Sequence, residues 1–400
     1  MQPGTAEIER TPPRAASGPK PADARLVRVV VAAGGAYGLV YGAIWIAQFS
    51  GINDFFVFWS AARWVAERGF DPAIYDVEAF RAFQTQLLAQ TAGAYRPYAY
   101  PPTGLLAFAP LAGLALAPAL AAFLGLSLAG YLAAIAWGRG KAAVALAASP
   151  AALMNIVVGQ NGFLTAGLLY GGLHLAGRRP WIAGILIGLL SIKPQLGLLV
   201  PVALLASRQW ICLTAAASAT LALAAASVIA GGVEIWTAWL ELLPRFAANT
   251  AANSESASRF MVSPPAVLLT LGLDYATARI VHLPIALGLA GAVWVMCRRF
   301  GLTPLTVAAV ATATLLATPF AYFYDLTIAA AATAILAADA LKRGFLPGEK
   351  LVLALVWVAP LIAVADLPLS WLVTLALALQ FLAIWRRLAA APTVVDGTAP

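Results

Sequence analysis

Long apolar runs, separated by short polar breaks, follow one another along almost the whole chain. Hydrophobic residues make up 62% of its 400 residues and charged residues only 10%, whereas soluble domains carry about 25% charged residues. A helix needs about 20 mostly apolar residues to cross a bilayer. The sequence therefore predicts an all-α polytopic membrane protein with about 12 transmembrane segments.

Basic residues lie in short clusters between the apolar runs, and the net charge is +8. Nucleic-acid-binding proteins instead gather Lys and Arg into one stripe or patch, so this distribution indicates membrane topology. Arg25 and Arg28 flank the start of the first apolar run, 29–49, which predicts an uncleaved anchor with the N-terminus in the cytosol. Residues 1–26, rich in Pro, Ala and Gly, and residues 389–400 are predicted to be disordered cytosolic tails on a single transmembrane domain, 27–388.

Because Lys and Arg are enriched in cytosolic loops, the remaining basic clusters indicate which apolar segments cross the membrane. They all fall in the cytosol only if residues 102–116 form a surface-lying or re-entrant helix, so that 50–116 make one extracytoplasmic loop. Lys193-Pro194 interrupts the apolar stretch 181–206, because proline disfavours helical geometry at the preceding residue, and we expect two half-length helices there. With a second extracytoplasmic loop at 231–276, the unusual polar residues collect on one face. Discontinuous helices are tolerated where they line a cavity, so one large cavity that opens to the exterior is predicted.

Asp54 follows the first apolar run and begins the first extracytoplasmic loop. Charged groups near the bilayer usually face a cavity or a partner, and a partly desolvated carboxylate can serve as a general base. The alternative is a helix-end carboxylate that is solvated in the loop. Beyond it, Phe55–Arg68 and 77–90 carry apolar residues at helical spacing and are predicted to be interfacial helices.

Several polar and aromatic residues after these helices have the chemistry of a sugar-phosphate site. The fork of donors in Arg96 suits a phosphate oxygen, although an interfacial anchor is an equal alternative. Tyr98 and Tyr100 can stack on a sugar ring. Gln160 and Asn161 place two amides between apolar helices, where the alternative is a helix-capping turn.

Lys193 lies in the middle of an apolar stretch without an acidic residue nearby in the sequence. A cation at that depth needs an anion, and we expect a lipid phosphate to supply it. Residues 231–276 and 318–325 carry aromatic, amide and charged groups on the same predicted face. The candidates from these two segments are Arg259, Tyr322, Tyr324 and Asp325. For the last of them, the alternative is a first-turn acid favoured by the helix dipole.

The sequence has no motif for a metal or a nucleotide. His174 and His282 are isolated on apolar segments without metal-ligand spacing, and there is no Walker motif or Cys/His cluster. Cys212 and Cys297 lie close to basic residues at predicted cytosolic helix ends, where a disulfide would not persist. No metal site and no cofactor are therefore predicted.

The order and spacing of these motifs resemble glycosyltransferase family 87 over about residues 30–340. The resemblance rests on the acidic residue after the first helix and on Asp71-Pro72, Tyr75-Asp76, Tyr100-Pro101-Pro102, Gly159-Gln160-Asn161 and Lys193-Pro194. It implies a GT-C fold and transfer of a hexose, typically mannose, from a polyprenyl phosphate to a lipid or glycan acceptor. The transfer would take place with inversion on the outer face of a bacterial-type plasma membrane, with Asp54 as catalytic base. Related mannosyltransferases often have a histidine within 318–325, where this chain has two tyrosines.

In the resulting mechanism, Asp54 deprotonates the acceptor hydroxyl as it attacks the anomeric carbon. Cations stabilise the departing polyprenyl phosphate, and the candidates are Lys193, Arg63, Arg96 and Arg259. A phosphate leaves readily, so we hypothesise that no metal is required. One alternative is a lipid or glycan transporter or flippase, which should show internal repeats with paired helix breaks. The other is a non-catalytic subunit of an envelope polysaccharide assembly system.

Overall fold

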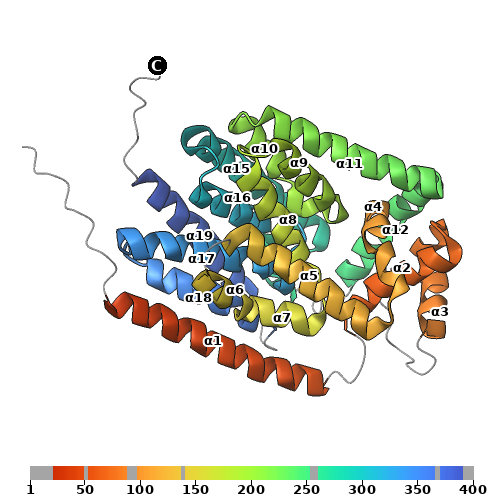
Figure 1. Cartoon of the computed structure of the whole chain (residues 1–400), viewed down its shortest axis with the longest axis horizontal. Helices are drawn as coiled ribbons and strands as arrows, with labels where there is room; N and C mark the ends of the chain where they lie inside the picture. Colours follow the sequence, from red (N-terminus) through yellow and green to blue (C-terminus); the bar gives the residue numbers. More distant parts are fainter. Residues whose placement is uncertain are drawn as a thin grey trace, which may run out of the picture.

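The computed structural model describes residues 21–48, 53–87, 97–136, 140–252, 260–364 and 370–390. Within these ranges the chain is helical, with turns between the helices and one isolated bridge between Met261 and Tyr322. The helices pack into a bundle, shown in Figure 1. The predicted all-α class is confirmed.

The N-terminal part of the chain contains two long helices with a group of short ones between them. Its elements are α1 (Pro21–Gln48), α2 (Phe55–Arg68), η1 (Pro72–Tyr75), α3 (Val77–Leu87), α4 (Pro102–Phe108), η2 (Ala109–Gly113) and α5 (Leu116–Ala136). The helix predicted over Phe55–Arg68 is confirmed, and it stops at Gly69, whose φ of 73° is readily adopted only by glycine. The segment α4–η2 is too short to cross a bilayer on its own, and the surface-lying or re-entrant position expected for 102–116 stays a prediction. Because α1 begins at Pro21, the end of the predicted N-terminal tail is helical.

The middle of the chain alternates short broken helices with longer ones. Its elements are α6 (Gly140–Ala147), α7 (Pro150–Val158), α8 (Gly162–Leu175), α9 (Pro180–Leu189), η3 (Leu190–Ile192), η4 (Pro194–Gly197), α10 (Val200–Ala206), α11 (Trp210–Gly231) and α12 (Glu234–Ala252). The predicted break at Lys193-Pro194 is confirmed, because Lys193 (φ −141°, ψ 69°) separates η3 from η4. The segment 231–276, predicted as a loop, contains the 19-residue helix α12.

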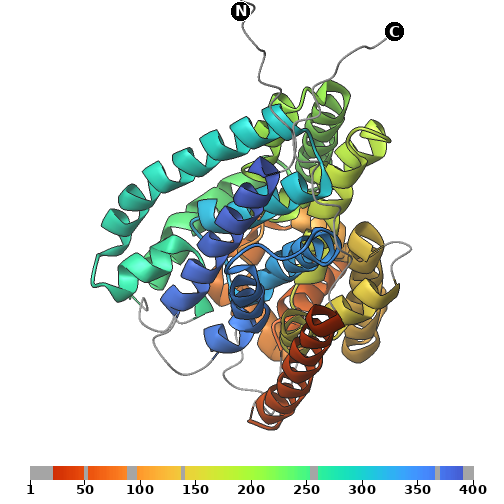
Figure 2. The same cartoon turned by 90° about the vertical axis from the view of Figure 1, so that its left-hand side faces the viewer.

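The C-terminal part includes α16, the most completely buried helix among the described residues. Its elements are α14 (Pro264–Thr270), α15 (Tyr275–Phe300), α16 (Pro304–Ala317), η5 (Phe323–Asp325), α17 (Leu326–Arg343), α18 (Glu349–Val364) and α19 (Ser370–Ala389). Helix α16 is buried from Leu305 to Ala317 and packs against α15, α17 and α19. Helix α15 runs along one edge of the bundle in Figure 2, with α1 at another.

Five helices in the described part of the chain are long and apolar enough to cross a membrane: Leu116–Ala136, Trp210–Gly231, Tyr275–Phe300, Phe323–Arg343 and Trp371–Ala389. The pair α6–α7, bent by 47°, would make a sixth span. Large apolar side chains stand exposed on the outer helices, such as Ile229 on α11 (86%) and Ile280 on α15 (71%), as expected for surfaces that face lipid. The chain is therefore a membrane protein, while the count of about 12 spans and the interfacial position of α2 and α3 stay predictions.

A buried ion-pair cluster ties together the ends of α17, α18 and α19. The Arg387 guanidinium donates from Nε to Glu349 Oε1 at 2.8 Å and from NH1 to Asp339 Oδ2 at 2.9 Å. It also donates from NH2 to Glu349 Oε2 and to the Gly344 carbonyl. Arg387 and Glu349 are both buried, so each charge depends on the other for its stability.

Candidate active site

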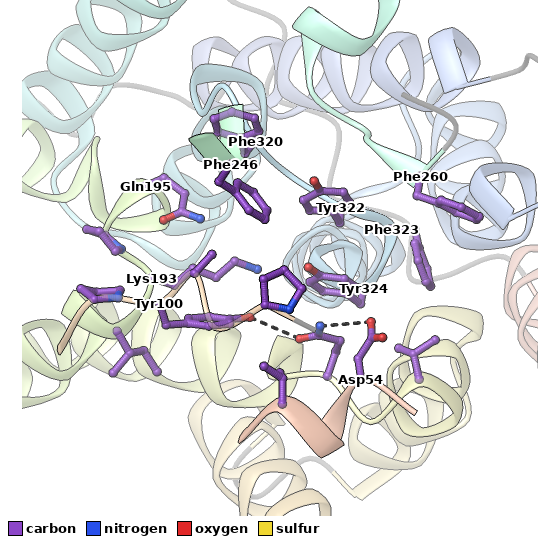
Figure 3. A pocket seen from close by; sticks show the side chains of 18 of the residues that line it. Asp54, Tyr100, Lys193, Gln195, Phe246, Phe260, Phe320, Tyr322, Phe323 and Tyr324 are labelled. Atoms are coloured by element: carbon purple, nitrogen blue, oxygen red, sulfur yellow. Dashed lines mark hydrogen bonds between the residues drawn. The ribbon is translucent and has the colours of Figure 1, made fainter. Parts of the chain in front are cut away.

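A cavity of about 1080 Å³ lies where the predicted polar segments meet. Its walls come from the start of α2, residues 97–101, the end of α7, the break between η3 and η4, one face of α12 and the turn 319–324 (Figure 3). The predicted site residues that line it are Asp54, Tyr100, Gln160, Lys193, Tyr322 and Tyr324. Asn161 and Asp325 bond to members of this set. The cavity is therefore built from segments far apart in the sequence.

Asp54 is held at the cavity by both its backbone and its side chain. Its backbone N–H donates to the Val158 carbonyl at 2.8 Å, which fixes the start of α2 against the end of α7. Its half-buried carboxylate accepts a hydrogen bond through Oδ2 from Gln160 Nε2 at 3.2 Å, dashed in Figure 3. Asp54 is therefore not simply a solvated helix-end carboxylate.

Gly159 allows the turn after α7 to approach Asp54. Its φ of 68° is in the left-handed region, and a Cβ there would lie 2.8 Å from both Asn53 Nδ2 and Phe55 Cβ. Because real Cβ atoms essentially never come so close, a larger residue would push the turn away from the start of α2. Position 159 therefore requires glycine both for its left-handed backbone and for the close approach of the start of α2.

Tyr100 connects the two amides of the same turn. Its hydroxyl donates to Gln160 Oε1 at 3.5 Å and accepts from Asn161 Nδ2 at 3.1 Å. The Tyr75 hydroxyl donates to the Tyr100 carbonyl at 3.0 Å and holds this segment in place. Burial, together with the negative charge of Asp325, raises the pKa of Tyr100 well above its usual value. The hydroxyl therefore stays protonated and can donate across the physiological pH range.

Lys193 and Asp325 form a buried ion pair beside the cavity. Lys193 Nζ lies 2.5 Å from Asp325 Oδ1, with side chains that are 4% and 0% exposed. Oδ2 of the same carboxylate accepts the Tyr322 backbone N–H at 3.0 Å. We expected a lipid phosphate to supply the anion for Lys193, but the chain itself provides one, the Asp325 carboxylate 132 residues further along the sequence. A contact between Lys193 and a phosphate stays a prediction.

An aromatic wall stands next to this ion pair. The rings of Tyr322 and Tyr324 are stacked, with centroids 5.6 Å apart and an interplanar angle of 15°. Lys193 Nζ lies 4.7 Å from the centre of the Tyr324 ring, within range of a cation–π contact. The same wall includes Phe320 and Phe323 (Figure 3). Flat faces of this kind can pack against a sugar ring.

The structure does not bring every predicted site residue to the cavity. Arg63 lies outside the lining and pairs with Glu67 on the same helix at 2.7 Å. Tyr98 is buried behind Tyr100, with ring centroids 5.7 Å apart. Arg96 and Arg259 lie outside the described residues.

Several lining residues were not among the predicted site residues, although Trp239 belongs to the aromatic residues noted in 231–276. Trp239, Leu243 and Phe246 follow a spacing of four and three residues, so one face of α12 points into the cavity. Trp239 also donates from Nε1 to the Ala99 carbonyl at 3.1 Å. The helical spacing of these apolar residues could have predicted this face from the sequence. Gln195, which directly follows the Lys193-Pro194 break, also lines the cavity and was detectable as an amide within an apolar stretch.

Metal ligands do not cluster in the described ranges, where no three His, Cys, Asp or Glu side chains come together as a possible metal site.

The fold and the cavity define an integral membrane protein with charged and amide groups at a site enclosed by apolar and aromatic walls. Residues 98–319, more than half of the chain, match the model of glycosyltransferase family 87. The chain belongs to this family and is therefore a membrane glycosyltransferase. The comparisons with curated proteins and with solved structures found no match. Asp54 precedes the matched residues and Asp325 follows them, so their roles are argued from geometry.

Proposed function

We propose that the enzyme transfers a hexose, with mannose as the first candidate, from a polyprenyl-phosphate donor to a hydroxyl of a lipid or glycan acceptor. One observation above all supports this proposal: Asp54 and Lys193 line the same cavity, so one substrate complex can reach both a base and a cation (Figure 3). From the basic clusters of the sequence we infer that the reaction takes place on the extracytoplasmic face of a bacterial-type plasma membrane, with both termini in the cytosol.

The reaction is a displacement at the anomeric carbon. The acceptor oxygen attacks from the side opposite the phosphate, which inverts the configuration. As the new carbon–oxygen bond forms, the carbon–oxygen bond to the phosphate breaks and its electron pair leaves with the polyprenyl phosphate. The proton of the acceptor hydroxyl passes to the Asp54 carboxylate.

Lys193 is suited to the departing phosphate because it is already held in place. An ammonium group has three N–H donors, and the bond to Asp325 occupies one of them. A phosphate oxygen can take another without breaking the ion pair. Negative charge that develops on the leaving group is then stabilised by a cation that does not have to reorganise.

The charge balance of the cavity calls for further cations. Asp54, Asp325 and Lys193 together carry a net charge of −1, and the donor phosphate adds to it. Pro97 and Phe260 line the cavity, and the residues next to them in the sequence are Arg96 and Arg259. We therefore assign the additional phosphate contacts to these two arginines and not to Arg63, which is paired elsewhere.

The remaining walls suit a lipid-linked sugar. Leu198 lines the cavity and is itself 51% exposed, so the apolar wall continues to the outer surface of the bundle, where an isoprenoid chain can enter. The stacked rings of Tyr322 and Tyr324 offer a platform for the hexose.

The test is transfer of labelled hexose from polyprenyl-phosphate mannose and from polyprenyl-phosphate glucose, using membranes that contain the wild type or Asp54→Asn. We expect transfer from one of the donors by the wild type and a loss of at least about 100-fold in the variant, because general-base catalysis contributes about 10²–10⁴-fold. Glu67→Gln, which removes a carboxylate outside the cavity, is the matched control and should retain activity.

Neither alternative would form a glycoside in this experiment, and a measurement of translocation of the labelled lipid separates the two. A transporter or flippase would move the labelled lipid across the membrane without forming a glycoside. A non-catalytic assembly subunit would give no product with either donor. If Asp54→Asn transferred hexose as fast as the wild type, the assignment of the base would be wrong.

A further inference from the structure

The Gln160 amide is fixed at both of its ends. Its Oε1 accepts from the backbone N–H of Asn161 at 3.2 Å and from the Tyr100 hydroxyl at 3.5 Å. Its Nε2 donates to Asp54 Oδ2 at 3.2 Å. Gln160 is only 6% exposed, so few other orientations are available to it.

The direction of this amide follows from its neighbours. A backbone N–H can only donate, so the atom that faces Asn161 N must be the oxygen of the amide. The opposite orientation would turn that oxygen toward the Asp54 carboxylate, and two acceptors would then face each other without a proton between them. The amide therefore presents a donor to Asp54 in the only arrangement that satisfies both contacts.

We infer that Gln160 is the positioning residue of Asp54, and that Tyr100 acts through Gln160 and not through the substrate. The inference rests on the proposed function and changes the role first predicted for these two residues, which was substrate binding. Asp54 comes from the start of α2 and Gln160 from the turn after α7, so their hydrogen bond sets the carboxylate relative to the other walls of the cavity. A misplaced base loses rate even when substrate still binds.

The first test is Gln160→Met, which keeps the approximate length of the side chain and removes the donor. A hydrogen bond to a charged group accounts for about a 10- to 100-fold effect. We expect kcat to fall by this factor while KM for the donor lipid changes less than about threefold. A substrate ligand would instead show its main effect in KM.

The second test is Gln160→Glu, which places a second carboxyl group against Asp54. Two carboxyl groups in contact share one proton, and this proton is lost at a higher pH than the proton of a single carboxyl group. We expect the acid limb of the pH–rate profile to move upward by about one pH unit or more, with activity partly recovered at alkaline pH. A purely structural defect would lower the rate equally at all pH values.

The third test is the double-mutant cycle of Tyr100→Phe and Gln160→Met. Tyr100→Phe alone should lower kcat about 2- to 10-fold, as expected for a neutral hydrogen bond. In the Gln160→Met background, Tyr100→Phe should have no further effect, because its action passes through the amide. Independent, multiplicative effects would show that Tyr100 does not act through Gln160.

The controls separate this inference from the proposed function. Gln209→Glu introduces the same change at the start of α11, where the amide donates to the nearby Ser207 carbonyl, and should leave kcat and the pH profile unchanged. If Asp54→Asn is inactive while Gln160→Met has wild-type kcat, the positioning role is wrong and the proposed function stands. If Asp54→Asn is active, the proposed function itself fails.

Discussion

Replacing Lys193 by Met should destabilise the protein by about 3–5 kcal/mol, which is typical when one partner of a buried ion pair is removed. Asp325 has no exposed surface, and its Oδ1 would lose the ammonium group that lies at 2.5 Å. The backbone N–H of Tyr322, at 3.0 Å from Oδ2, would remain. One hydrogen bond from a neutral donor does not compensate a buried carboxylate.

Asp325→Asn in the same chain should restore much of this stability. The side-chain oxygen of Asn can still accept from Tyr322, and no charge is left in the buried site. Because replacing both partners of a buried pair is often nearly neutral, we expect the double variant to be more stable than either single variant by about 2 kcal/mol or more. The exposed pair Arg63–Glu67, with side chains 36% and 43% exposed, is the control, and Glu67→Gln should cost only about 0.3–0.5 kcal/mol.

The assay is denaturant unfolding of the purified protein in detergent micelles, with free energies obtained by linear extrapolation. Wild type, both single variants and the double variant complete one cycle. The reasoning is refuted if the two single losses simply add in the double variant. It is also refuted if Lys193→Met costs no more than the exposed control.

Three further predictions concern stability and metal dependence. Arg387→Ala should lower the free energy of unfolding by about 3–5 kcal/mol, because Glu349 stays buried without its cation. The control is Arg386→Ala: this exposed neighbour bonds to the Pro347 carbonyl, and its loss should cost at most about 1.5 kcal/mol. Equal losses for the two variants in unfolding experiments would contradict the role of burial. Gly159→Ala should be about 1–3 kcal/mol more destabilising than Gly272→Ala. Both glycines have a positive φ, but of the two only Gly159 has neighbours within 4 Å of the added Cβ. Similar unfolding midpoints for the two variants would show that the close approach is unimportant. Hexose transfer should persist in EDTA, since Lys193 and the candidate arginines supply the positive charge for the leaving phosphate; inactivation that Mn²⁺ or Mg²⁺ reverses would disprove metal independence.

Local sequence signals predicted the helices and their interruptions. The apolar spacing of Phe55–Arg68 and the glycine after it gave the bounds of α2. The steric effect of Pro194 on the preceding residue placed the break at Lys193. Such features depend on interactions between residues close together in the chain, which is why they can be read before the fold is known.

Contacts between distant segments could not be predicted in the same way. Nothing in the sequence around Lys193 points to Asp325, which lies 132 residues further along the chain, so the ion pair between them could not be predicted. Arg63 has the chemistry of a phosphate ligand, but Glu67 one turn later already pairs with it. The amphipathic helix α12 was predicted as a loop because its polar face resembled a solvated segment.

The surroundings of the two carboxylates explain why Asp54 and not Asp325 is assigned as the base. Asp325 is fully buried, and its oxygens bind the Lys193 ammonium and the Tyr322 N–H. A proton on Asp325 would break the ion pair and leave Lys193 as an uncompensated buried cation, at a cost of several kcal/mol. Asp54 lines the cavity, is only half-buried, and accepts from the neutral Gln160 amide. It can take a proton from the acceptor without breaking an ion pair with Lys193, which remains available to the phosphate. In the proposed mechanism the two carboxylates therefore have different roles: Asp54 accepts the proton, and Asp325 holds Lys193 in place beside the cavity.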